Sequence, residues 1–82
     1  MNIYQEWKTY PLSELKEIKK FNIQFKKQLR LDIKEFSEWQ LLFGLNEARE
    51  EFIKRMRKDL RWVQFNLNYL NAIIKRRQNE TR

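Results

Sequence analysis

Basic side chains at helical spacing are the most distinctive candidate functional residues of this 82-residue sequence. At 100° per residue, six of them between residues 16 and 30 fall within one third of a helical wheel, and no acidic residue shares that sector. The row would extend about 21 Å along a helix, far enough to meet several phosphates of a nucleic-acid strand. Ile23 is an unexpected apolar residue in its middle. These candidate residues for binding nucleic acid or an acidic partner are Lys16, Lys19, Lys20, Lys26, Lys27 and Arg30.

Aromatic and basic side chains also alternate in the C-terminal half of the chain. Trp62, Phe65 and Tyr69 share one side of a predicted helix and are the candidate protein-binding residues. Basic residues stand four positions before two of these rings, a spacing that permits cation–π contact and suits single-stranded nucleic acid or an acidic protein groove. The basic residues on this side are Lys54, Lys58, Arg61 and Arg76. The alternative is that the rings belong to the core, as aromatic stripes at helical spacing more often do.

Catalytic groups are scarce in this sequence. Histidine and cysteine are absent, which removes thiolate nucleophiles, Ser-His-Asp triads and metal sites that depend on imidazole. A single glycine cannot build a phosphate-binding loop. Two groups of carboxylates remain, Glu35 with Glu38, and Glu47 with Glu50 and Glu51. Helix capping, the helix dipole and i,i+4 pairing with basic residues explain both groups without catalysis. We therefore expect no enzymatic activity, no cofactor and no metal site.

Composition predicts one small all-α domain spanning residues 1–82. Hydrophobic residues make up 41% of the chain, enough for a core, while one glycine and one proline leave little with which to build the tight turns of a β-fold. The longest uncharged apolar run, residues 41–45, is far too short to span a membrane. With no cysteine to suggest secretion, we expect a cytoplasmic protein without membrane insertion. A net charge of +7 favours an anionic partner.

The first half of the chain is predicted to hold an arm and two helices. An aromatic N-terminal arm, residues 1–12, should form a short helical turn or a strap across the core. A helix over 13–30, capped by Ser13, carries an apolar seam that includes Asn22. That asparagine either fixes the pairing register of the seam or lies at its solvent edge. A capping box formed by Asp32 and Glu35, with Leu31 and Phe36 as a hydrophobic staple, predicts a separate helix over 33–43 that ends at Gly44.

A long third helix is predicted over 47–78, capped by Asn46. It carries an unbroken coiled-coil-like heptad pattern of a and d positions, Ile53, Met56, Leu60, Val63, Leu67, Leu70 and Ile74. Its length of about 48 Å exceeds the roughly 27 Å of the helix over 13–30, so that half of it lacks a full-length partner. We therefore predict a homodimer whose oligomer seam is Val63, Leu67, Leu70 and Ile74, with packing inside one chain as the alternative.

These observations predict an all-α helical hairpin or three-helix bundle with one long C-terminal helix, dimeric, and functioning as a non-catalytic binding module. Its first candidate partner is nucleic acid, bound by the basic row. The alternative is a protein-binding adaptor, inhibitor or assembly factor of phage or mobile-element type that uses the aromatic stripe, with the positive charge attracting an acidic protein. A helix-turn-helix around Gly44 fits poorly, because Gln40 and Glu50 stand where that motif needs small or apolar residues.

Overall fold

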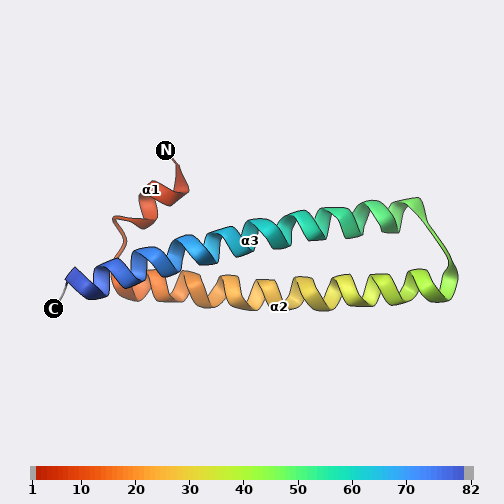
Figure 1. The fold of residues 1–82 in the computed structure, drawn as a ribbon, viewed down its shortest axis with the longest axis horizontal. Coiled ribbons are helices and arrows are strands. Elements are labelled where there is room, and N and C mark those ends of the chain that lie inside the picture. The colour runs from red at the N-terminus through yellow and green to blue at the C-terminus, as the bar shows by residue number, and fades with distance from the viewer. Residues whose placement is uncertain (1, 81–82) are drawn as a thin grey trace.

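The computed structural model describes residues 2–80, which contain three helices. They are α1 (Ile3–Trp7), α2 (Leu12–Phe43) and α3 (Glu47–Glu80). The two long helices lie side by side and antiparallel, and α1 lies against the end of the hairpin that holds both termini (Figure 1). The molecule is a thin rod of 56 × 24 × 14 Å. The predicted all-α hairpin with a long C-terminal helix is confirmed.

The predicted break between helices over 13–30 and 33–43 is wrong, because α2 continues through Leu31 and Asp32. Asp32 does not cap a new helix; instead its carboxylate accepts a hydrogen bond of 2.9 Å from Nε2 of Gln28, one turn earlier. No glycine or proline interrupts the backbone here. Ile33 and Phe36 pack against the same core cluster as the residues before them. Continuous packing against α3 outweighs the local capping signal.

The turn between the long helices follows the predicted capping residues. Gly44 has φ 83° and donates its N–H to the carbonyl of Gln40 at 2.9 Å. Its ψ of 176° makes the backbone extended rather than the left-handed helical cap that we predicted. Oδ1 of Asn46 accepts hydrogen bonds from the N–H groups of Ala48 and Arg49, at 2.9 and 3.3 Å, so the predicted cap of α3 is confirmed. A three-residue connection therefore returns the chain antiparallel.

The start of α2 differs slightly from the prediction. Pro11, not Ser13, is the capping residue, and its carbonyl accepts the N–H of Leu15 at 3.1 Å. The fixed φ of proline suits the start of a helix. At the other end of the chain, α3 extends two residues beyond the predicted boundary, to Glu80.

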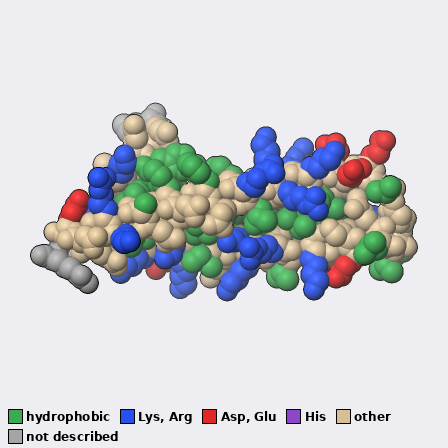
Figure 2. Space-filling view, in the orientation of Figure 1, with side chains coloured by type: hydrophobic (Ala, Val, Ile, Leu, Met, Phe, Trp, Pro, Cys, Tyr) green, Lys and Arg blue, Asp and Glu red, His purple; other side chains and the backbone are tan. Residues whose placement is uncertain are grey.

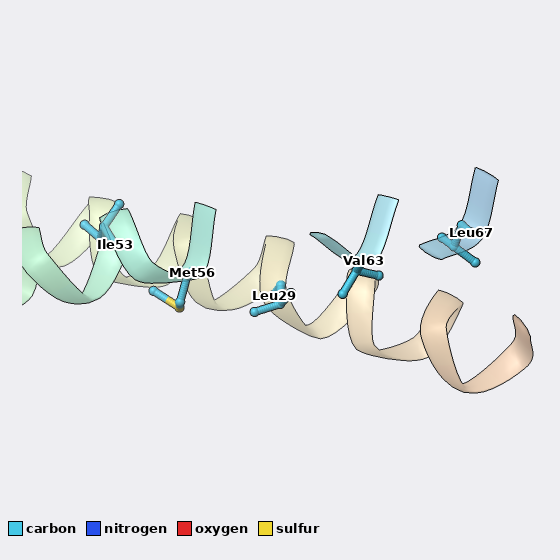
Figure 3. Close-up of a cluster of buried hydrophobic side chains, with 5 residues drawn as sticks. All are labelled: Leu29, Ile53, Met56, Val63 and Leu67. Carbon is cyan, nitrogen blue, oxygen red and sulfur yellow. The ribbon is translucent and has the colours of Figure 1, made fainter. Parts of the chain in front are cut away.

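The middle of the hairpin is held together by the predicted heptad seam. Leu29 of α2 lies between Met56 and Val63 of α3 along the rod, with Ile53 and Leu67 continuing the row on α3 (Figure 3). Six of the seven predicted a and d residues are buried, and the seventh, Leu60, is half-buried against this cluster; the buried ones are Ile53, Met56, Val63, Leu67, Leu70 and Ile74. The heptad prediction is therefore confirmed.

A second cluster joins α1 to the hairpin. Trp7 is buried with Leu15, Leu70 and Ile74. The Arg77 guanidinium donates to the carbonyl oxygens of Tyr10, at 3.0 Å, and Lys8. The N-terminal arm is thus a short helix packed on the core, as predicted.

Val63, Leu67, Leu70 and Ile74, the predicted oligomer seam, are all buried within one chain. The dimer was predicted because the first helix seemed too short to cover α3. That premise was wrong, since α2 has 32 residues against the 34 of α3, and Trp7 covers the remaining part of the seam. These four side chains are core residues and offer no surface to a second copy.

Candidate functional site

The hairpin has two broad sides, because each long helix buries only the stripe that faces the other. On one side the Lys26 ammonium donates to Oε1 of Gln64 across the edge of the seam. On the other side the Tyr4 hydroxyl of α1 donates to Oδ1 of Asn66 at 2.9 Å. At 100° per residue the whole row from Lys16 to Arg30 lies on the Lys26 side. We call this the basic side, and the side that α1 covers in part the aromatic side.

The basic side brings the predicted row together on one rigid helix. Its exposed members are Lys16, Lys20, Lys27 and Arg30, while Lys19 and Lys26 are half-buried. Lys26 is held by Gln64, whose own amide donates to Asn68 at 3.0 Å. Because α2 is uninterrupted, the row keeps a fixed spacing along its full length.

Ile23, the unexpected apolar residue of the row, is half-buried and packs against the Leu29 cluster. The basic sector therefore begins at the edge of the seam, where an apolar residue has a packing role. All four exposed cations lie farther round the helix from the seam than Lys26 does.

Acidic residues are absent from the middle of the rod. Residues 18–31 of α2 and 60–79 of α3 contain no Asp or Glu, and the contact of Lys26 with Gln64 sets these stretches side by side. On the visible face, Lys and Arg side chains project along both long edges, whereas acidic ones gather toward the ends (Figure 2). The protein therefore presents a positively charged middle section to any polyanion.

The aromatic stripe of α3 is divided by α1. Tyr69 is half-buried, with its ring centroid 5.1 Å from that of Tyr4 and its hydroxyl donating to the Tyr4 carbonyl at 3.2 Å. Phe65 meets the edge of the same ring at 5.4 Å but remains 56% exposed, and Trp62 is 53% exposed. Tyr69 is thus a packing residue, whereas Trp62 and Phe65 keep accessible surface. The basic residues near them, Lys54, Lys58, Arg61 and Arg76, are all exposed.

Two groups of exposed apolar residues were not predicted from the sequence. Phe21 and Phe25 stack on each other with ring centroids 6.5 Å apart and lie on the aromatic side of α2. A larger group surrounds the turn: Trp39, Leu41, Leu42, Phe43, Leu45 and Phe52. The run at 41–45 had been judged as a membrane span, and Trp39, Leu42 and Phe43 had been assigned to the apolar side of the short helix predicted over 33–43. In a short separate helix these residues would have been core, but at the end of a long rod nothing covers them.

A shallow groove of about 540 Å³ lies between the end of α1 and the C-terminal part of α3. Its charged lining residues are Lys8, Arg76, Arg77 and Glu80. Arg77 is engaged with backbone carbonyls, so the groove is part of the attachment of α1. Within residues 2–80, no cluster of three or more acidic side chains could hold a metal ion.

Comparison with known proteins gives no relative to reason from: no family model matches the chain, and no curated protein or solved structure is significantly similar to it. Among the helices described for residues 2–80, none combines the length and apolarity needed to cross a bilayer. The function is therefore inferred from the surfaces of the hairpin alone.

Proposed function

We propose that this protein is a non-catalytic binding module that contacts an anionic polymer, with nucleic acid as first candidate, through its basic side. The supporting observation is the row of exposed cations on an uninterrupted helix, most of it in the stretch of the rod without acidic residues. Neutralising several phosphates releases their condensed counterions, which provides most of the affinity in non-specific binding.

The composition of the row favours phosphate contacts over base readout. Five of its six members are lysines, which act as mobile point charges and lack the planar, fixed donor geometry with which Arg, Asn and Gln read base edges. Two long helices packed side by side also exceed a DNA major groove, which is roughly 12 Å wide and admits a single helix. Binding should therefore follow the backbone and show little sequence preference.

The test is the salt dependence of binding to short duplex and single-stranded DNA and RNA, measured by fluorescence anisotropy. The slope of log K against log salt should be about −0.7 to −0.9 for each phosphate contacted. The triple variant Lys16→Gln, Lys20→Gln and Lys27→Gln should flatten it by about two to three units with helicity unchanged, because all three side chains are exposed.

The matched control removes the same charge elsewhere, with Lys8→Gln, Arg55→Gln and Arg76→Gln, three exposed residues outside the row. This control should keep most of the slope. Equal loss in both variants would mean that overall charge, not the basic side, attracts the polymer. No binding to any of these nucleic acids at about 50 mM salt would refute the proposal, since the electrostatic contribution is strong there.

A protein-binding adaptor or assembly factor is the second candidate, supported by the accessible rings of Trp62 and Phe65 beside Lys58 and Arg61. In that case Trp62→Ala should abolish binding, while the lysine triple variant should mainly slow association. A cytoplasmic location and an accessory role in phage or mobile elements fit either candidate.

A further inference from the structure

The turn end of the rod is unusually apolar for a surface. Six large apolar side chains remain about half exposed or more there, and Leu41 and Leu45 are each 87% exposed. We call this group the apolar tip: Trp39, Leu41, Leu42, Phe43, Leu45 and Phe52. Clustered exposed apolar residues rimmed by polar ones mark interaction sites on soluble proteins.

The charge around the apolar tip is opposite to that of the rest of the chain. Residues 32–51 hold six carboxylates against two cations, a net charge of −4, while the remaining residues hold sixteen cations against five carboxylates, a net charge of +11. An acidic rim repels nucleic acid and anionic lipid surfaces. The occupant of the tip should therefore be a surface with an apolar centre and basic surroundings.

This chain carries such a surface on the aromatic side. Phe21 and Phe25 of α2 and Trp62 and Phe65 of α3 are all exposed. The register set by Lys26 and Gln64 places the two pairs within about one helical turn of each other along the rod. We call these four residues the aromatic patch; the exposed basic residues on its α3 flank are Lys58 and Arg61.

The apolar tip and the aromatic patch of one chain cannot meet. About eighteen residues separate their centres on α2, or roughly 27 Å along a straight helix. At 100° per residue, however, Trp39 and Phe43 lie on the same side of α2 as Phe21 and Phe25. A second copy could face the first through its aromatic side and run in the opposite direction. Each tip would then lie on the other copy's patch, with α2 packed on α2 and α3 packed on α3.

The two-fold axis of such a dimer runs perpendicular to the rod, so it must pass α2 and α3 at the same height along the rod. On α2, residue 32 is midway between the pair Phe21–Phe25 and the pair Trp39–Phe43. On α3, residue 57 is midway between Phe52 and Trp62. The contact of Lys26 with Gln64 sets residue 32 opposite residue 58, so the two midpoints agree within one residue, about 1.5 Å.

We propose that the occupant of the apolar tip is a second copy of this chain, in an antiparallel two-fold dimer in which each tip covers the partner copy's aromatic patch. Trp39 and Phe43 pack on Phe21 and Phe25 of the other copy, and Phe52 packs on its Trp62. Glu51 then stands opposite residues 63–65 of the other copy, within about one helical turn of Arg61 on the basic flank of the patch. Leu41 and Leu42 project to other sides of α2 and stay outside this contact.

The available surface is close to what a stable dimer requires. Seven exposed aromatic rings on the aromatic side, each roughly half accessible, offer roughly 700 Å² per chain, given about 150–250 Å² for a whole aromatic side chain. A standard interface buries about 800 Å² per partner. The basic sides face outward in this dimer, so the inference does not depend on the proposed function.

Light scattering after size exclusion and sedimentation equilibrium test the proposal at micromolar to about 100 μM protein. The wild type should have about twice the 10.4 kDa mass of the chain. Phe43→Glu and Trp62→Glu should each give a folded monomer. The dimer has two equivalent contacts, each between a tip and a patch, and the first variant disrupts the tip in both contacts while the second disrupts the patch in both. Leu41→Glu, at an equally apolar but uninvolved position, should remain dimeric.

Mixing the two monomeric variants distinguishes this dimer from others. A mixed pair keeps one intact tip on one intact patch, so a heterodimer should form, weaker than the wild-type dimer, while each variant alone stays monomeric. A wild-type monomer at about 100 μM, open-ended polymers, or no recovery on mixing would each overturn the proposal. Circular dichroism of every variant shows whether loss of dimer reflects unfolding.

Discussion

The hydroxyl of Tyr4 donates a hydrogen bond of 2.9 Å to Oδ1 of Asn66, a residue 62 positions later in the chain. Asn66 is only 2% exposed, so this bond satisfies a buried amide and ties α1 to α3. The contact explains why the chain tolerates a polar residue beside the heptad seam.

Tyr4→Phe should lower the free energy of unfolding by about 1–3 kcal/mol, because it leaves a buried acceptor without its partner. Urea denaturation followed by circular dichroism measures the change. Adding Asn66→Leu should recover most of the loss, since two apolar groups then face each other. No recovery in the double variant would show that Asn66 has another essential contact.

Leu70→Ala should cost about 2–5 kcal/mol, because its side chain is fully buried between α1, α2 and α3. Leu60→Ala should cost clearly less, since Leu60 is only half-buried at the edge of the central cluster. The order of these two values in thermal or urea denaturation checks the burial pattern. Equal costs would place Leu60 in the core.

Gly44→Ala should destabilise the hairpin by about 1–3 kcal/mol through its backbone alone, because φ 83° with ψ 176° is a region that only glycine occupies readily. An added Cβ would meet no atom within 4 Å, so crowding makes no contribution. Asn, which tolerates the left-handed helical region, should not relieve this strain. A Gly44→Asn variant as stable as wild type would mean that the turn adopts a different conformation.

Asn22→Leu should leave stability unchanged or increase it. Asn22 is buried in the seam, but its amide donates to the carbonyl of Ile18 in its own helix at 2.8 Å, not to α3. It therefore has no cross-helix bond with which to fix the register. A loss above about 1 kcal/mol in urea denaturation, the scale of an ordinary hydrogen bond, would contradict this account.

The sequence by itself determined the features that depend on local chemistry. Asn46 and Gly44 define the turn because capping and positive φ are properties of single residues. The heptad spacing on α3 determined which side chains are buried, since helical geometry alone places them on one stripe. The basic row on α2 follows from the same geometry.

Only the tertiary structure decided features that depend on which other segment of the chain packs against a residue. The capping signal at Asp32 competes with packing against α3, and a local pattern cannot tell which is stronger. Tyr69 and Trp62 share one stripe, yet α1 covers the first and not the second. The residues of the apolar tip look like core in the sequence, but they are exposed because α2 and α3 end together and no third element reaches the turn. Burial depends on the whole arrangement of the chain, which residue type and spacing do not specify.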